Sequence, residues 1–271
     1  MKSYAICDKE LDGCLIGYLF YFEKAENFII ELCADLEEWD APLLFQKMVR
    51  EKKYTIPTDV SLMWVKERVV PSGRQNIGTI LKNHKLKEYS EMALLNLSKG
   101  RCSQDSCYIV EIQEEQIPSD IKDRMKKNIR ECFPVEGNQM VCLFKDNAVK
   151  KINLSLLIGQ YQELSHVLKN KMLLDSMKVG PGGYSVIFND SIEIAVSDIR
   201  RIGQVIPLTA EDFYNFVSRN VLDTTRTCEM LQCSRQNISY LVKEKKITPI
   251  ICGTKENLYL KGDMEVFINE K

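Results

Sequence analysis

The last fifth of the chain contains the pattern that most constrains the fold, which is that of two short helices joined by a tight turn. Asp223 and Ser234 stand just before the two helices, where their side-chain oxygens can accept the free N–H groups of a first turn. In the second helix Ile238, Leu241 and Val242 fall at positions i, i+3 and i+4 and form one apolar stripe. The pattern therefore predicts a helix pair that buries one face and leaves the other open.

The opposite face of the second helix is polar and carries Arg235, Gln236, Ser239, Tyr240 and Lys243. A short helix with an outer face of amide, guanidinium and hydroxyl groups suits the reading of base edges in a major groove. Between positions 235 and 255 there are five basic residues and a single acidic one, Glu244. Phosphate contacts need such an excess of positive charge, so the segment favours DNA binding.

The sequence after this helix predicts a small hairpin and a last helix. Residues 250–252 and 258–260 have the composition of short strands, and 253–257 has that of a turn. Gly262 and Asp263 then begin a short helix. The expected order is helix, turn, helix, hairpin wing and helix.

Residues 224–238 carry the motif T-T-x-x-C-x-x-L-x-C-S-R-Q-x-I, with which the segment resembles the excisionase and MerR-type DNA-binding families. Two positions depart from the family pattern: Arg226 stands where a Glu often completes a capping box, and Gln232 where the turn usually has Gly. The resemblance implies a winged helix-turn-helix and sequence-specific DNA binding, as in a transcriptional regulator of prokaryotic or phage type. The residues predicted to contact double-stranded DNA are Thr224, Thr225, Ser234, Arg235, Gln236, Asn237, Ser239, Tyr240, Lys243, Lys255 and Asn257, the last two at the hairpin tip.

A second class of function stays open, because helix-turn-helix units also dock proteins. In that alternative the chain is an antitoxin-like interaction partner. An enzyme is not expected. The carboxylates of Glu37-Glu38 and Glu114-Glu115 are adjacent in sequence and point apart, and Cys102 has no histidine nearby in sequence. No catalytic residue and no cofactor are therefore predicted.

Composition indicates a folded chain rather than a disordered one, with 45% hydrophobic and 28% charged residues among 271. The ten cysteines form no C-x-x-C pair and the two histidines are far apart, so no metal site is expected. No apolar run approaches the roughly 20 residues of a membrane span, and no signal peptide is recognisable. We therefore expect a cytoplasmic protein with reduced thiols and no membrane association.

Four segments are predicted, and the fold class of the whole is α+β. Residues 1–115 form a mixed α+β domain with 19 acidic and 15 basic residues, which suits a partner, a ligand or self-association better than DNA. Residues 116–137 form a linker or an exposed helix, 138–213 a small α+β domain, and 214–271 the winged unit. We expect a homodimer, with the N-terminal domain as the site for a protein partner.

The middle domain contains two hairpins with the same sequence pattern. Residues 141–152 and 184–194 each have the pattern strand, Asp-Asn or Asn-Asp turn, strand, followed by an apolar helical turn. A further strand is expected over 172–178. With these hairpins and the stretch Gly-Gly-x-x-Val-x-Phe-Asn-Asp-x-Ile-Glu, the region resembles a small bacterial domain family of unknown function often encoded near toxin–antitoxin-like genes, and the resemblance implies no catalytic residues.

The tetrapeptide Arg-Gln-Asn-Ile of 235–238 occurs a second time, at 74–77. A Pro-Ser-Gly break precedes the earlier copy in place of a capped helix, so we interpret the recurrence as coincidence. A phosphate or a carboxylate could be bound here by Arg68, Arg74, Gln75 and Asn76. The alternative is a solvated helix start in which an arginine satisfies backbone carbonyls.

Overall fold

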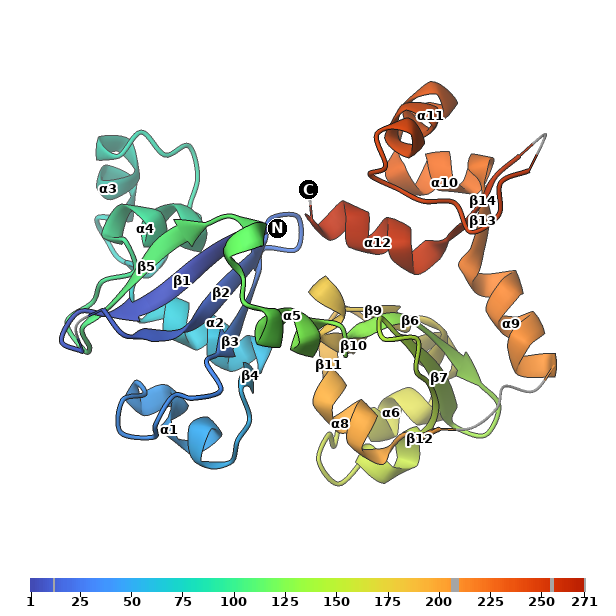
Figure 1. The fold of residues 1–271 in the computed structure, drawn as a ribbon, viewed down its shortest axis with the longest axis horizontal. Helices are drawn as coiled ribbons and strands as arrows, with labels where there is room; N and C mark the ends of the chain where they lie inside the picture. The colour runs from blue at the N-terminus through green and yellow to red at the C-terminus, as the bar shows by residue number, and fades with distance from the viewer. Residues whose placement is uncertain (12, 206–209, 254–255, 271) are drawn as a thin grey trace. The chain divides into compact units, whose positions relative to one another are not determined.

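The computed structural model describes residues 1–11, 13–205, 210–253 and 256–270. The chain divides into two compact units, Met1–Ile121 and Lys122–Lys271. Helices occur together with antiparallel sheets, which confirms the predicted α+β class (Figure 1).

The first unit is built on a five-stranded antiparallel sheet with the order β4-β3-β2-β1-β5. The strands are β1 Lys2–Asp8, β2 Leu15–Phe22, β3 Asn27–Leu32, β4 Thr55–Ile56 and β5 Cys107–Ile112. The helices are α1 Leu43–Arg50, α2 Thr58–Lys66, α3 Ile77–Asn83 and α4 Glu91–Ser98. The 3-10 turn η1 Glu114–Gln116 and the helix α5 Ser119–Met125 lead into the second unit.

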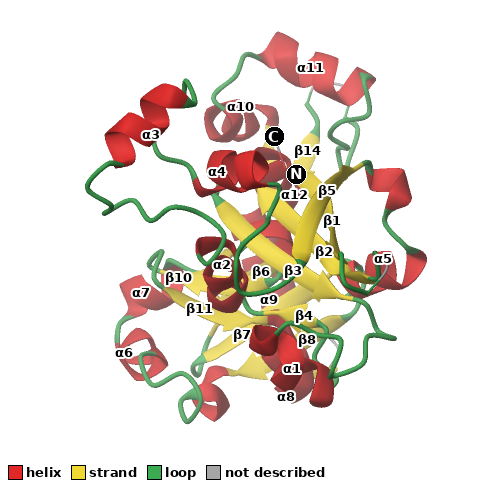
Figure 2. Cartoon of the chain, turned by 90° about the vertical axis from the view of Figure 1, so that its left-hand side faces the viewer, coloured by secondary structure: helices red, strands yellow, loops and turns green. Residues whose placement is uncertain are grey.

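Three of these helices share a core with the sheet. Phe45 of α1, Trp64 of α2 and Leu95 of α4 are fully buried in one cluster with Leu19 and Ile30 of the strands. The rings of Phe45 and Trp64 stack at 6.3 Å between centroids. Burial of such large apolar side chains contributes about 1.5–3 kcal/mol each, so this cluster holds the helices on the sheet (Figure 2).

The second unit contains sheets with the orders β12-β8-β7-β6, β11-β10-β9 and β13-β14. The strands are β6 Ile129–Val135, β7 Gln139–Phe144, β8 Val149–Asn153, β9 Lys178–Val179, β10 Ser185–Phe188, β11 Ile192–Ala195, β12 Gln204–Val205, β13 Val221–Asp223 and β14 Leu258–Leu260. The helical elements are η2 Leu154–Leu157, α6 Leu164–Lys169, α7 Lys171–Asp175, η3 Pro181–Gly183, α8 Val196–Ile202, α9 Ala210–Asn220, α10 Thr224–Leu231, α11 Arg235–Lys243 and α12 Lys261–Glu270.

The two predicted hairpins of the middle domain are confirmed. β7 pairs with β8 and β10 with β11, and each hairpin is followed by a helical element, η2 or α8. Asn147 in the first turn has φ 64°, and Asn189 and Asp190 in the second have φ 48° and 56°. Asn and Asp enter this left-handed region at low cost, which is why the turn residues could be recognised in the sequence.

The strand expected over 172–178 is wrong for most of its length. The Asn170 side chain accepts a hydrogen bond from the Met172 N–H at 2.9 Å and begins α7. Only Lys178 and Val179 at the end are extended, as β9. A local cap therefore prevails over the apolar content that suggested a strand.

The prediction of a linker over 116–137 is also wrong, because its second half is β6. This strand pairs with β7 along its length, with Cys132 opposite Cys142 and Phe133 opposite Val141. Pro134 lies within it, which the position of β6 at the edge of its sheet allows. The strand was not predicted because the segment contains a proline and many charged residues.

The segment 214–271, predicted as a separate domain, packs on β6 within the second unit. The Phe133 ring lies 5.4 Å from that of Phe216 in α9. A buried carboxylate oxygen of Glu131 accepts the N–H of Gly262 at 2.7 Å, in the first turn of α12. A Cβ on Gly262 would lie 2.3 Å from the Arg130 carbonyl oxygen, so the approach of α12 to the strand requires glycine.

Candidate nucleic-acid interface

The helix pair α10–α11 rests on a small apolar core of its own. Ile238 and Leu241 of α11 are 1% and 4% exposed, and Val242 is partly buried beside them. The residues that complete this cluster are Leu222, Ile247, Tyr259 and Met264. The predicted stripe of α11 is therefore confirmed, and it fixes which face of the helix points outward.

Both predicted caps are present. A carboxylate oxygen of Asp223 accepts the N–H of Arg226 at 2.7 Å, and the Ser234 hydroxyl oxygen accepts that of Asn237 at 3.3 Å. Each bond satisfies one of the donors that a helix start leaves free, and each is worth about 1 kcal/mol. The first helix starts without the capping-box Glu that the family pattern has at position 226.

The turn between the helices closes in spite of the missing glycine. Gln232 takes up the left-handed conformation, with φ 50° and ψ 47°. The N–H of Cys233 then reaches the carbonyl of Cys228 at 3.0 Å. A residue with a Cβ pays roughly 1 kcal/mol or more for this conformation, which is small beside the burial of the apolar stripe.

The outer face of the pair is exposed and polar. Of the residues predicted to contact DNA, Thr224 is half-buried, and the exposed ones are Thr225, Ser234, Arg235, Gln236, Asn237, Ser239, Tyr240 and Lys243. Lys245 and Lys246 follow directly and are exposed as well. The structure therefore brings all nine of these predicted residues, from 224 to 243, onto one helix pair.

Arg235 is held in place from the neighbouring helix. One of its terminal nitrogens donates to the Thr225 hydroxyl oxygen at 2.7 Å. The Ser239 hydroxyl donates in turn to the Arg235 carbonyl at 3.1 Å. A guanidinium has five N–H donors, so this arrangement orients Arg235 and leaves donors for a base edge.

The segment between α11 and β14 differs from the expected two-stranded wing. Ile251 forms a single bridge with Leu258, while β14 pairs over three residues with β13. Leu222 of β13 and Tyr259 of β14 are buried, and this burial supports the long-range pairing on one side of β14. On its other side Leu258 keeps a short local contact, because it donates to the Ile251 carbonyl at 3.0 Å and accepts from the Ile250 N–H at 2.8 Å.

Asn257 lies beside Thr224, whose hydroxyl donates to the Asn257 carbonyl at 3.4 Å. The Asn257 side chain accepts the Gly253 N–H at 3.3 Å and donates to the Tyr259 hydroxyl at 3.4 Å, so its amide organises the turn. Lys255 lies outside the described residues. Sequence reasoning missed Ile250 and Ile251, which are 41% and 55% exposed beside the basic stretch. The sequence signal that could have indicated them is the presence of two apolar residues within a basic loop.

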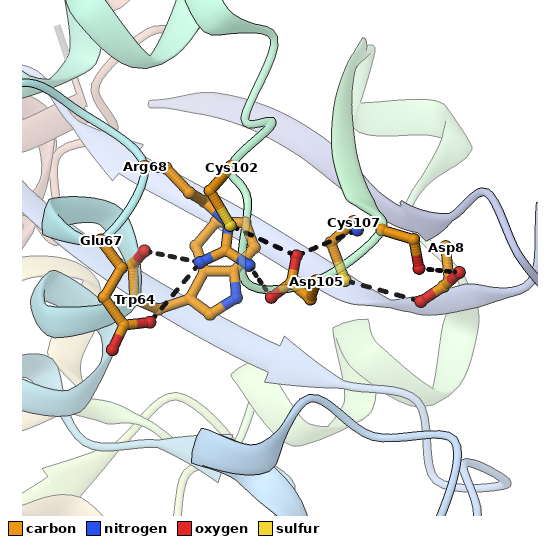
Figure 3. A network of polar contacts seen from close by, with 8 residues as sticks. Asp8, Trp64, Glu67, Arg68, Cys102, Asp105 and Cys107 are labelled. Atoms are coloured by element: carbon orange, nitrogen blue, oxygen red, sulfur yellow. Dashed lines mark hydrogen bonds and ion pairs between the residues drawn. The ribbon is translucent and has the colours of Figure 1, made fainter.

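A second polar cluster lies in the first unit around Arg68 (Figure 3). Its guanidinium stacks over the Trp64 ring at 3.6 Å, donates to the Trp64 carbonyl at 2.9 Å and pairs with Asp105. The same carboxylate accepts from the Cys107 N–H at 3.0 Å and from the Cys102 thiol at 3.7 Å. Arg68 is thus neutralised inside the fold and serves to hold the chain before β5.

The thiols of this cluster lie beside carboxylates. Burial, with the charge of Asp105 as a further cause, raises the pKa of Cys107 to about 12. Cys102 has a carboxylate as its acceptor rather than a histidine. The exposed Arg74 lies outside this network, so the suggested binding of a phosphate by Arg68 together with Arg74 is not supported.

Among the described residues, no group of three or more His, Cys, Asp or Glu side chains is placed to hold a metal ion. Within the same part of the chain, no helix has the length and apolar character to cross a membrane. Comparison with family models, with curated proteins and with solved structures gives no match for this chain.

Proposed function

We propose that this chain is a sequence-specific DNA-binding protein of the winged helix-turn-helix class, with α11 as the recognition helix. The observation that carries the proposal is the exposed polar face of α11 above a buried stripe of Ile238 and Leu241. A helix of nine residues with such a face has the size and chemistry to enter a major groove. The most specific function that this supports is transcriptional regulation of the prokaryotic or phage type.

The charge of the surface agrees with this role. Arg235, Lys243, Lys245 and Lys246 are exposed, with Glu244 as the single acidic residue among 235–246. Neutralising phosphates supplies the sequence-independent part of DNA affinity, while the face of α11 supplies the readout. Such a regulator acts in the cytoplasm, and its ten free cysteines suit a reducing compartment.

The experiment is selection of bound sites from a random pool of double-stranded DNA by the full chain at moderate salt. Enrichment of one motif is expected. Failure to enrich any sequence, with weak salt-sensitive binding only, would contradict sequence-specific recognition.

We further propose that the full chain binds DNA as a homodimer on an inverted repeat. A single α11 reaches only a few base pairs, and residues 214–271 carry nine basic against seven acidic residues, which is a modest charge. Joining two copies can raise avidity about 10²–10⁴-fold when the geometry fits. Sedimentation of the full chain with and without the selected DNA tests this, and a monomer in both states contradicts it.

An interaction partner of antitoxin-like type is the second candidate. The exposed apolar side chains of Ile250, Ile251 and Tyr240 beside α11 favour it, because such residues are common at protein interfaces. The pool selection separates the two candidates, since a protein-docking surface enriches no DNA motif.

A further inference from the structure

The second unit has an open cavity of about 400 Å³ next to the end of α11. Its wall includes Arg130 of β6, Lys145 just after β7, Lys246 and Ile247 just after α11, and Phe267 of α12. Cavities of roughly 300–1,000 Å³ where structural layers meet are typical small-molecule sites. Of the predicted DNA contacts that the structure describes, none lines it.

The positively charged side chains of the wall differ in their hydrogen-bond partners. Arg130 donates two hydrogen bonds to Asp263, at 3.1 and 2.9 Å, and is neutralised by it. Lys145 donates to the Gly182 carbonyl at 3.0 Å, which is an uncharged acceptor for an ammonium with three donors. Burial lowers the pKa of Lys145, and the charges of Glu270 and Asp263 oppose that shift only in part.

Lys145 therefore lacks a direct ionic partner among the residues that the structure describes, in a position where a charge is costly. A ligand anion would supply that partner. Lys246, also in the wall, is exposed and adds to the positive potential. The wall thus has three cations, Arg130, Lys145 and Lys246, against the two carboxylates of Asp263 and Glu270, and this excess of one positive charge favours a negatively charged ligand.

Besides the charged residues and Thr248, the wall has an apolar part. Ile247 and Met264 are 4% and 0% exposed, and Val266 and Phe267 of α12 lie beside them. Apolar contacts add affinity in proportion to the area they bury. A ligand that fits both parts of the wall has an anionic group and an apolar body.

We propose that this cavity binds a small organic carboxylate, with the anion at Lys145 and the apolar body against α12, and that occupancy alters DNA binding by α11. The coupling is short. Ile247 packs in one core with Ile238 and Leu241, and the Lys246 N–H donates to the Leu241 carbonyl at 2.9 Å. A ligand that shifts 246–247 acts directly on the base of the recognition helix.

The binding part of this proposal stands on the cavity alone, whereas the regulatory part rests on the proposed DNA binding. Calorimetric titration of the full chain with benzoate, without DNA, tests the first part, and benzyl alcohol serves as the neutral match. Benzoate is expected to bind and benzyl alcohol to bind at least about tenfold more weakly, because a charge-assisted hydrogen bond contributes about 1.5–3 kcal/mol.

Lys145→Met should weaken benzoate binding at least about tenfold for the same reason. Lys150→Met is the matched control, since Lys150 also donates to a backbone carbonyl, that of Arg200 at 2.6 Å, but does not line the cavity. Lys246→Met, at an exposed position, provides a second variant should Lys145→Met fail to fold, and a severalfold loss is expected.

Absence of benzoate binding, or equal binding by the wild type and both cavity variants, overturns the site. The affinity of the full chain for its selected DNA is then compared with and without saturating benzoate. A change of severalfold supports the coupling, and an unchanged affinity overturns it. If benzoate binds but no DNA sequence is selected, the proposed function fails while the ligand site stands.

Discussion

The tetrapeptide Arg-Gln-Asn-Ile stands at the start of two helices of this chain, where 235–238 forms the first turn of α11 but only Ile77 of 74–77 belongs to α3. At α11 the Ser234 side chain caps the helix, and Ile238 is 1% exposed in a core. At α3 the capping position is Asn76, whose side chain makes no cap hydrogen bond, and no residue of the helix is buried. The same four residues thus form a fixed surface only where a cap and a core hold them.

The arginines of the two copies, Arg235 and Arg74, differ in the same way. Arg235 is oriented by the Thr225 hydroxyl at 2.7 Å, whereas Arg74 is exposed before the first turn of α3. Orientation lowers the entropy lost when a side chain binds, so Arg235 is the better reader of a base edge. Three experiments can compare these two helices directly, and a fourth tests the contact of Glu131 that anchors the segment of α11.

The largest difference between the two copies of the tetrapeptide is expected when the isoleucine of each, Ile238 or Ile77, is truncated to alanine. Ile238→Ala is expected to lower the free energy of unfolding by about 2–5 kcal/mol, because it leaves a cavity in a small core. Ile77→Ala should cost no more than about 1 kcal/mol, since Ile77 is half-buried on a helix without buried residues. Urea unfolding of the full chain followed by circular dichroism measures both, and equal losses would contradict the comparison.

The arginines should differ in DNA binding. Arg235→Ala is expected to weaken binding to the selected site by about 1–3 kcal/mol, and the fold should survive because Arg235 lies off the apolar stripe. Arg74→Ala is the matched control and should leave the affinity unchanged. Fluorescence anisotropy with labelled DNA gives both values, and an unaltered affinity for Arg235→Ala would remove it from the readout.

The contact of Glu131 with Gly262 anchors the segment that contains α11, and the pH dependence of the free energy of unfolding tests it. Burial, with Glu265 as a further cause, raises the pKa of Glu131 to about 8, against an ordinary value of 4.5. The folded state therefore holds a proton that the unfolded state releases between these values. Stability from this group is complete below about pH 4.5 and is lost as the pH rises toward 8, by up to about 1.4 kcal/mol per unit.

Glu131→Gln should flatten this decline between pH 5 and 8. Its overall stability should fall as well, because one amide oxygen replaces the two carboxylate oxygens that accept the Cys132 and Gly262 N–H groups. Glu136→Gln, at an exposed position just after the same strand, is the control. Chemical unfolding at several pH values provides the slopes, and parallel curves for wild type and Glu131→Gln would refute the assignment.

The smallest effect is expected at the last turns of the two helices. Lys243 in α11 and Lys82 in α3 are both exposed there. Lys243→Ala should lower the slope of log affinity against log salt by about one, as for one lost phosphate contact, with little change in sequence preference. Lys82→Ala should leave the slope as it is, and a changed motif for Lys243→Ala would assign that residue to base readout.

Much of the helix pair could be predicted because its signals are local. The caps at Asp223 and Ser234 act over three residues, and the stripe of α11 repeats within one or two turns. The same holds for the hairpin turns at Asn147 and Asn189, where the residue type itself permits a positive φ. The segment 172–178 shows the limit, because there a cap at Asn170 outweighed an apolar composition.

The features that escaped prediction depend on residues far apart in the chain. The strand at 258–260 was predicted, but its pairing with β13, a three-residue strand more than thirty positions earlier, was not. The pairing of Arg68 with Asp105 spans 37 residues, and the contact of Glu131 with Gly262 spans 131. A free and a neutralised arginine look alike in the sequence.

The sequence by itself determined the α+β class, the capped helix pair and the outward polar face of α11. Each follows from propensity, capping and periodicity within a few neighbouring residues. Only the tertiary structure decided that β6 joins a sheet, that α12 docks on it through Glu131, and that Lys145 lines a cavity beside the recognition helix. The physical reason is that burial and charge compensation depend on which distant segments meet, and no local pattern specifies that meeting.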